Sequence, residues 1–206
     1  MGLTFRLDFH QSAEHTAPLL LGGVLRFGQV AVRLTEVEAY VGRKDPASHA
    51  YNGPTPRCET MFGSPQRLYV YASYGIHRAG NLVCHPEGEA GGILLRAGEV
   101  IAGRELVRQR RGEKHAEENL ARGPGNLGQA LGFDLHLDGS RVIQVDDALG
   151  LDTPEEGVLY LQPPAERAEF VAGPRIGISK NVAAPLRFWI PGDRTVSSPR
   201  GRPRAV

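Results

Sequence analysis

The alternation of apolar and polar residues predicts most of the strands of this chain. Residues 24–41 (VLRFGQVAVRLTEVEAYV) alternate and are rich in Val and Leu, which is typical of strands in a sheet. Residues 68–84 form an aromatic, β-rich run interrupted by two glycines, and residues 91–100 (GGILLRAGEV) predict a further strand. Residues 42–58 are dense in Gly, Pro and Asp, which predicts a long ordered loop between the first two runs.

Helical patterns are fewer. Residues 99–111 carry apolar residues among charges, which predicts a helix, and residues 123–132 (GPGNLGQALG) predict a short helix with Pro124 in its first turn. The N-terminus of such a helix can hold an anion such as a phosphate. Two later runs, RIGI at 175–178 and PLRFWI at 185–190, predict late strands.

The order of these elements predicts the fold class. Strands follow one another with few interspersed helices, so we expect a single α+β domain: a curved, mostly antiparallel β-sheet with a few flanking helices. The 206 residues suffice for one domain with a real core. We expect the domain to span residues 1–198 and a basic, disordered tail to occupy residues 199–206, where its arginines suit phosphate contacts.

Composition narrows the class of protein only slightly. No stretch approaches the roughly 20 apolar residues of a membrane helix, and the N-terminal sequence lacks a signal-peptide pattern. Two cysteines cannot form a disulfide framework, so we expect an intracellular, cytoplasmic protein, nucleoid-associated if bacterial. The net charge of +1 does not indicate a nucleic-acid-binding protein. Arginine makes up nearly all of the basic residues and suits phosphate contacts, but a GC-rich genome explains this bias equally well.

Two carboxylates in TEVEAY, Glu36 and Glu38, share one face of the predicted strand. Neighbouring carboxylates repel, so at least one must be exposed, hydrogen-bonded or paired with a cation. Periodicity alone favours a solvated outer face, with Val37 and Ala39 inside. The functional interpretation requires a cation, and Arg96, which follows an apolar run, needs an acidic partner. A Glu–Arg pair holding a water would be a hydrolytic centre, but the sequence does not pair these residues.

Aromatic residues are concentrated in the same part of the chain. Six of the 14 aromatics fall between positions 40 and 74, namely Tyr40, Tyr51, Phe62, Tyr69, Tyr71 and Tyr74. Core packing explains most of them, and stacking on nucleobases, worth about 1–3 kcal/mol per base, is the alternative. The histidines and cysteines do not have the spacing of a zinc site, and the chain contains neither G-x-S-x-G nor a Walker loop.

Several ordered motifs then point to one family. E-x-E-A-Y, D-x-A-S-H, L-Y-V-Y-x-x-Y-G and L-L-R-A, followed by LARGPGNLGQAL, PRIGI and PLRFWI, closely resemble the alkyladenine (3-methyladenine) DNA glycosylase family, the mammalian-type group that also occurs in bacteria. The resemblance spans roughly residues 17–198. It implies an enzyme that flips a damaged purine out of double-stranded DNA and hydrolyses its N-glycosidic bond.

The resemblance also implies roles for residues of the reaction centre. Glu38 matches the general base that deprotonates the attacking water, and Arg96 matches a residue that helps to hold this water. Ile176 falls where a backbone carbonyl completes the water site. Tyr40 and Tyr71 match the two aromatics that sandwich the flipped base.

Four further residues match positions that read the base and the duplex. His49 matches a residue along the edge of the base, Asn81 a side chain that discriminates against guanine, and Leu94 a residue of the pocket wall. Tyr74 matches the residue that intercalates into the hole left in the duplex.

The implied chemistry is monofunctional. The sugar passes through an oxocarbenium-like state that a carboxylate stabilises while it activates water. A lyase needs an amine nucleophile, and none of the three lysines matches such a site, so we expect no lyase activity and no metal or organic cofactor. We expect a monomer acting on damaged duplex DNA and not on membranes. The lesion range, from 3-methyladenine and 7-methylguanine to hypoxanthine and ethenoadenine, stays open.

The chain departs from the family pattern at four places. His77 stands beside the implied wedge where an aromatic or hydrophobic residue is more usual, and Asn126 replaces a lysine. Cys58 and Glu59 replace Asn-Arg, and Thr195 replaces a tryptophan. Two of these changes make the surface less basic, so we expect weaker phosphate binding or a different lesion range.

Two other functions are compatible with the residues alone. One is a non-catalytic module that recognises damaged nucleic acid, against which the presence of Glu38 and Arg96 argues. The other is a hydrolase of nucleosides or other small N-glycosides, for which Tyr74 would have no use as a wedge.

Overall fold

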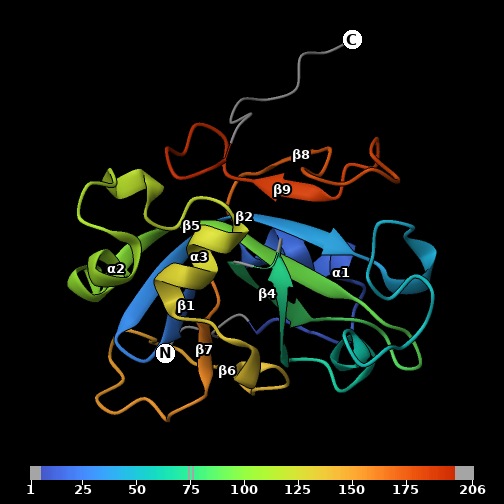
Figure 1. The fold of residues 1–206 in the computed structure, drawn as a ribbon, viewed down its shortest axis with the longest axis horizontal. Coiled ribbons are helices and arrows are strands. Elements are labelled where there is room, and N and C mark those ends of the chain that lie inside the picture. Colours follow the sequence, from blue (N-terminus) through green and yellow to red (C-terminus); the bar gives the residue numbers. More distant parts are fainter. Residues whose placement is uncertain (1–5, 74, 76, 198–206) are drawn as a thin grey trace.

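The computed structural model describes residues 6–73, 75 and 77–197, which fold around one curled sheet (Figure 1). The strands are β1 (Val24–Phe27), β2 (Val30–Tyr40), β3 (Leu68–Ser73), β4 (His77–Val83), β5 (Gly92–Ala102), β6 (Val142–Gln144), β7 (Leu159–Gln162), β8 (Val171–Gly173) and β9 (Arg187–Trp189). The α-helices are α1 (Ala13–Thr16), α2 (Arg104–Arg111) and α3 (Pro124–Leu131). Short 3₁₀ turns occur at Ala17–Leu20, Gly42–Lys44, Glu59–Phe62, Glu117–Asn119 and Leu135–Leu137.

The sheet runs in the order β3-β4-β5-β2-β1-β7-β6, and β9 pairs with both β2 and β8. Every one of these strand pairs is antiparallel except β6 with β7. The two longest strands, β2 and β5, lie side by side at the centre and curl as sheet twist accumulates. The predicted α+β class with a curved, mostly antiparallel sheet is confirmed.

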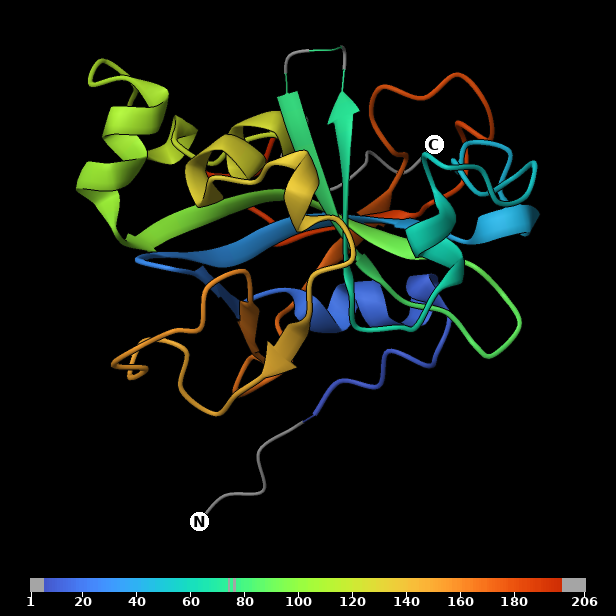
Figure 2. The ribbon, with the colours of Figure 1, turned by 60° about the horizontal axis from the view of Figure 1, so that its bottom comes forward.

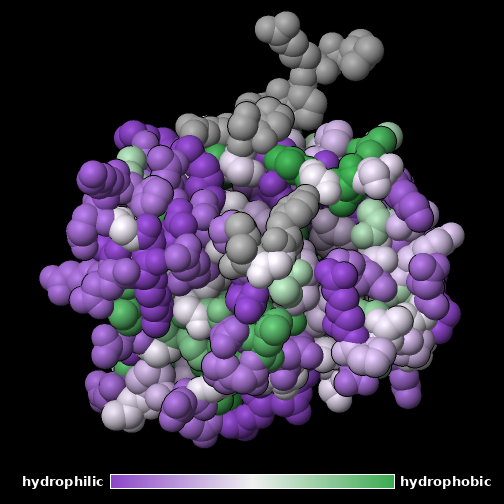
Figure 3. Space-filling view, in the orientation of Figure 1, coloured by the Kyte–Doolittle hydropathy of each residue, from purple (hydrophilic) through white to green (hydrophobic). Residues whose placement is uncertain are grey.

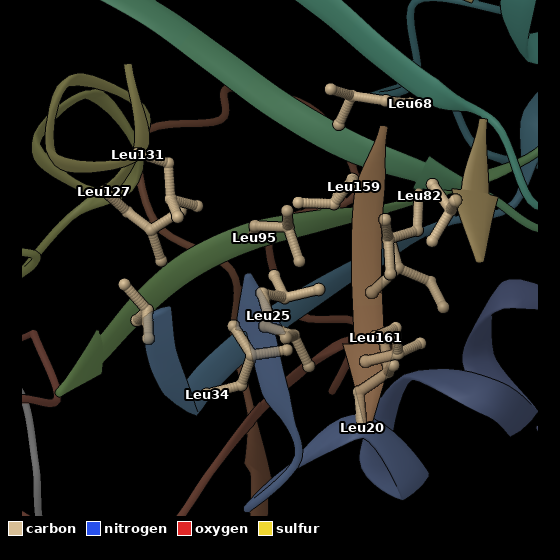
Figure 4. Close-up of a cluster of buried hydrophobic side chains, with 14 of the residues drawn as sticks. Leu20, Leu25, Leu34, Leu68, Leu82, Leu95, Leu127, Leu131, Leu159 and Leu161 are labelled. Atoms are coloured by element: carbon tan, nitrogen blue, oxygen red, sulfur yellow. The ribbon is translucent and has the colours of Figure 1, made fainter. Parts of the chain in front are cut away.

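Elements on both sides of the sheet bury its central strands. In Figure 2, α1 lies on one side, while α2, α3 and the β3–β4 hairpin project from the other. Leucines from six strands (β1 to β5 and β7) and from α3 meet in the main core (Figure 4), including Leu25 of β1, Leu34 of β2, Leu95 of β5 and Leu127 of α3, each with no exposed area. Burial of such side chains contributes about 1.5–3 kcal/mol each.

Most of the predicted elements are confirmed. Residues 24–41 form β1 and β2, residues 68–84 contain β3 and β4, and residues 123–132 contain α3. Residues 42–58 form a loop with only a 3₁₀ turn at its start.

One predicted boundary and one predicted strand are wrong. The helix expected from residue 99 begins at Arg104, because β5 continues to Ala102 and pairs there with β2. Gly103, with φ of +73°, ends the strand. The run RIGI is not a strand: β8 ends at Gly173, and residues 174–178 are irregular, with Gly177 at φ +76°.

The described surface is mixed in polarity, with hydrophilic side chains gathered over α2 (Figure 3). Among the described residues no helix is long and apolar enough to cross a bilayer. The predicted basic tail, residues 199–206, and the predicted wedge Tyr74 lie outside the described residues.

Candidate active site

The register of four adjacent strands brings residues from distant parts of the chain into one row. Glu38 on β2 lies opposite Leu94 on β5, Leu94 lies opposite Asn81 on β4, and Asn81 lies opposite Tyr69 on β3. Residues directly opposite one another in antiparallel strands share a face of the sheet. The row therefore presents a carboxylate, an amide and a phenol to the same side.

A cavity of about 680 Å³ lies over this row. Its lining includes seven of the predicted site residues: Tyr40, His49, Tyr71, Asn81, Leu94, Arg96 and Ile176. The structure thus brings together residues that are up to 136 positions apart in the sequence, as expected if they form one site. Tyr51 does not line the cavity and is 40% exposed.

Glu38 lies beside this cavity, with no exposed area. Its carboxylate accepts hydrogen bonds from the Ile176 backbone N–H (2.9 Å) and the Tyr40 hydroxyl (3.0 Å), and Nη1 of Arg96 lies 3.3 Å away. Burial raises the pKa of Glu38 above its ordinary value of 4.5, and these three partners offset only part of that effect. A buried carboxylate with a raised pKa is suited to accept a proton from a bound water.

Tyr40 contributes both a ring to the cavity wall and a hydroxyl to Glu38. Burial, reinforced by the neighbouring Glu38 carboxylate, raises the pKa of Tyr40 far above its ordinary value of 10, so the phenol stays protonated and donates.

The neighbouring carboxylate, Glu36, has a different environment. It accepts hydrogen bonds from Nε of Arg96 (2.9 Å), Nε of Arg187 (2.5 Å), and the backbone N–H and hydroxyl of Ser197 (both 2.7 Å). Glu36 and Glu38 are both fully buried, so the solvated outer face that periodicity favoured is wrong. The reason is that β5 and β9 both pair with this end of β2 and elements cover both of its faces.

A shift in register places Arg96 between the two carboxylates. Glu36 pairs with Ala97 and Val37 with Leu95, so β5 has one extra residue, Arg96, at this point. Such bulges redirect side chains. The expectation that Arg96 is buried and has an acidic partner is confirmed, and it contacts both glutamates.

Aromatic rings also line the cavity. The rings of Tyr69 and Tyr71 stack with centroids 5.6 Å apart, and His49 meets Tyr71 edge-on at 4.6 Å. His49 Nδ1 and the Tyr69 hydroxyl share a hydrogen bond of 2.9 Å. Partial burial and the nearby Arg57 lower the pKa of His49, so its imidazole is neutral at pH 7. A neutral ring can approach a cationic base without charge repulsion.

Three buried polar residues and one half-buried residue of this region were not among the predicted site residues. Arg187 is 1% exposed and pairs with Glu36. A lone arginine in the apolar run PLRFWI carries the same signal that identified Arg96. Arg175 and Asp45 fall within the quoted motifs PRIGI and D-x-A-S-H, but nothing in the sequence pairs them, and Ser197 carries no signal of its own.

Two missed basic residues lie at the cavity itself. Arg57 and Lys180 line it and are exposed, and the Arg57 guanidinium lies 5.8 Å from the centre of the Tyr71 ring. Both side chains add positive charge to the lining of the cavity.

The departures from the family pattern have local roles in the structure. The Asn126 amide donates a hydrogen bond to the carbonyl of Arg122 (2.7 Å). The Thr195 hydroxyl shares a hydrogen bond with the Thr35 hydroxyl and donates one to the Asp193 carboxylate. Cys58 is buried, whereas Glu59 is exposed.

His77 packs close to the start of α3, within 2.8 Å of where a Cβ on Gly125 would lie. Across the described residues, no three His, Cys, Asp or Glu side chains are grouped to hold a metal ion.

Comparison with known proteins identifies the family of this chain. The family model for methylpurine-DNA glycosylase (MPG) matches residues 7–194. A protein of Corynebacterium jeikeium is 65% identical over 197 residues, which cover 96% of this chain and 92% of the relative. One of Cutibacterium acnes is 53% identical over 198 residues, which cover 94% and 99%. Both bear the name "Putative 3-methyladenine DNA glycosylase". The chain belongs to the methylpurine-DNA glycosylase family of DNA repair enzymes.

Proposed function

We propose that this protein is a monofunctional DNA glycosylase that flips alkylated or deaminated purines out of duplex DNA and hydrolyses their N-glycosidic bonds. The observation that carries the proposal is the placement of Glu38: a buried carboxylate with a raised pKa, beside a cavity lined by aromatic rings. 3-Methyladenine and 7-methylguanine are the first substrates to test, followed by hypoxanthine and ethenoadenine.

The cavity suits a flipped purine. Tyr40 and Tyr71 supply the stacking surfaces, and His49 borders the edge of the base. Asn81 and Leu94, paired across β4 and β5, face the base from the sheet, where the Asn81 amide would discriminate against guanine. Extrusion costs a few kcal/mol, and stacking on the two rings offsets that cost. Tyr74, assigned as the wedge that fills the vacated stack, lies outside the described residues.

Hydrolysis follows from the partners of Glu38. The carboxylate accepts the proton of the attacking water as the C1′–N bond breaks, and its charge stabilises the oxocarbenium-like sugar. Arg96, 3.3 Å from Glu38, and the backbone carbonyl of Ile176 are assigned to hold this water. N3- or N7-alkylated bases are cationic and leave as neutral purines without an enzymatic acid, whereas hypoxanthine would have to be protonated.

The absence of lyase activity needs its own test, because Lys180 lines the cavity and carries an amine. A Schiff base would be trapped by borohydride as a covalent protein–DNA adduct. We expect no adduct with wild type. An adduct that Lys180→Ala abolishes would show instead that the enzyme is bifunctional.

The decisive experiment is single-turnover base release from a 7-methylguanine duplex and a hypoxanthine duplex, with wild type and Glu38→Gln. We expect wild type to release free base and leave the backbone intact, and Glu38→Gln to bind the duplex but to release base about a thousandfold more slowly. If wild type binds damaged DNA but releases nothing, the alternative applies: a non-catalytic module that recognises damaged nucleic acid. If wild type hydrolyses methylated nucleosides as fast as duplex DNA, the protein is a nucleoside hydrolase.

A further inference from the structure

We propose that Arg175 and Asp45, a buried ion pair behind Tyr40, are positioning residues of the active site. They hold the Ile176 amide against the Glu38 carboxylate and fix the ring of Tyr40. The inference rests on the function proposed above. It assigns to these two residues a role in the reaction, although neither lines the cavity proposed to hold the flipped purine.

The pair is fully enclosed and bidentate. Neither side chain has any exposed area. Nη1 of Arg175 donates to Oδ2 of Asp45 at 2.5 Å, and Nη2 donates to Oδ1 at 2.8 Å, a geometry that fixes both orientation and distance. Oδ1 of Asp45 also accepts hydrogen bonds from the Ala47 backbone N–H and the Asn181 amide, both at 3.1 Å. The carboxylate therefore ties the loop that leads to His49 to the segment around residue 181.

The guanidinium of Arg175 also contacts two parts of the reaction centre. It lies 4.5 Å from the centre of the Tyr40 ring, and its Nη1 donates to the carbonyl of Ala39 at 2.9 Å, between Glu38 and Tyr40 in the chain. The next residue after Arg175 is Ile176, whose N–H donates to Glu38. The Arg175 side chain thus links three parts of the site: the ring of Tyr40, the strand that carries Glu38, and the segment whose N–H binds Glu38.

The position of Ile176 depends on such side-chain contacts. Residues 174–178 are irregular and follow the end of β8, so the ladder of the sheet does not set their position. Arg175 anchors this segment to β2 through Ala39 and to the loop after β2 through Asp45.

Stability is a poor explanation for the pair. Burying two charges carries a large desolvation penalty, and apolar residues of similar volume are often as stabilising as a buried ion pair. In addition, Nε of Arg175 is buried without a hydrogen-bond partner in the structure. A costly, incompletely satisfied pair at this place is expected where geometry matters to the reaction.

The test uses substitutions that keep both charges and change only the geometry: Arg175→Lys and Asp45→Glu. A matched control is Arg33→Lys, which alters an arginine paired with Asp193 (2.8 Å) and Glu99 (2.9 Å) and lining no part of the active-site cavity. Single-turnover release from the 7-methylguanine duplex is measured across pH for all variants at saturating enzyme, with thermal unfolding measured in parallel.

We expect Arg175→Lys and Asp45→Glu to lower the plateau rate by about tenfold to a hundredfold, as small misplacements of reacting groups do. The acid limb is the fall in rate toward low pH. In both variants we expect the midpoint of this limb to move to higher pH by on the order of one unit, because a displaced Ile176 N–H no longer stabilises ionised Glu38. A general loss of stability would lower the amount of active enzyme without moving this limb. Arg33→Lys should retain the wild-type rate and limb.

Variants that fold and retain both the wild-type rate and the wild-type limb would overturn the proposal while leaving the proposed function intact. A lower rate with an unmoved limb in both variants would also overturn it. If neither variant folds, the pair stabilises the fold and the positioning role is wrong. If wild type itself releases no base, the proposed function fails first, and the two failures are thereby distinguished.

Discussion

Glu36 and Glu38 are the same residue type, two positions apart on one strand and equally buried, yet their surroundings differ. Glu36 accepts hydrogen bonds from two arginines and from both polar groups of Ser197. Glu38 has one arginine at 3.3 Å, one hydroxyl and one backbone N–H, and it lies beside the cavity. The number of compensating charges, and not burial, distinguishes a carboxylate that holds the fold together from one that is suited to accept a proton.

The raised pKa of Glu38 lowers the stability of the folded protein at neutral pH. Because the folded protein raises the pKa of Glu38 above 4.5, it binds the Glu38 proton more tightly than the unfolded chain does. The contribution of this residue to stability therefore falls as the pH rises from 4.5 through the folded pKa, and ionised Glu38 costs stability at pH 7. A reactive carboxylate of this kind therefore lowers the free energy of unfolding, a common trade-off between activity and stability.

The largest expected effect on stability comes from Glu36→Gln. The substitution removes the charge that compensates Arg96 and Arg187, and breaking a buried ion pair on one side typically costs about 3–5 kcal/mol. Urea unfolding at pH 7 measures the change. An unchanged midpoint would mean that Glu36 is not the structural member of the two.

Next in size is the stacking contribution of the aromatic wall. Tyr71→Ala removes one of the two proposed stacking surfaces and should weaken binding of damaged duplex and slow excision by about 1–3 kcal/mol in total. Tyr71→Phe keeps the ring and serves as the control. Equal losses in both variants would assign the effect to the hydroxyl and contradict stacking.

A smaller effect concerns the pH dependence of excision. Protonated Glu38 cannot accept a proton, so the single-turnover rate on 7-methylguanine should fall as the pH decreases through a midpoint above 4.5. Tyr40→Phe removes a hydrogen bond that favours ionised Glu38, so it should move this midpoint further up. A midpoint at or below 4.5 in wild type would argue against a desolvated base.

The smallest expected effect is electrostatic. The logarithm of the DNA-binding constant falls linearly with the logarithm of the salt concentration, with a slope of about −0.9 for each contacted phosphate. Because the net charge of the chain is only +1, we expect a shallow slope that corresponds to on the order of three to five contacts. Glu38→Gln should retain the wild-type slope, because it removes no phosphate contact. A slope of about −10 would require many more contacts than this chain is expected to make.

The local patterns of the sequence predicted the sheet but not the tertiary contacts that define the site. Alternation located β2, the run GGILLRAGEV located β5, and the apolar residues before Arg96 indicated that it is buried. The same alternation gave the wrong environment for Glu36 and Glu38, because β9, from residues 187–189, covers their end of β2. Arg175 pairs with Asp45 from 130 positions away, and no periodicity carries that information.

Family motifs predicted what periodicity did not. Seven residues assigned by resemblance line one cavity, and an eighth, Glu38, contacts three of these seven: Tyr40, Arg96 and Ile176. Their catalytic and binding roles stay predictions. The β-rich run RIGI predicted a strand, but the backbone around Ile176 is irregular and Gly177 adopts a left-handed conformation that glycine permits.

The measurement that most directly tests this account is a side-by-side determination of unfolding free energy and single-turnover base release for Glu36→Gln and Glu38→Gln in one buffer at pH 7. The account predicts that Glu36→Gln is strongly destabilised, whereas Glu38→Gln is as stable as wild type or more stable and has lost base release. If Glu38→Gln proved as unstable as Glu36→Gln, or still released base at the wild-type rate, the distinction between a structural and a reactive carboxylate would be wrong.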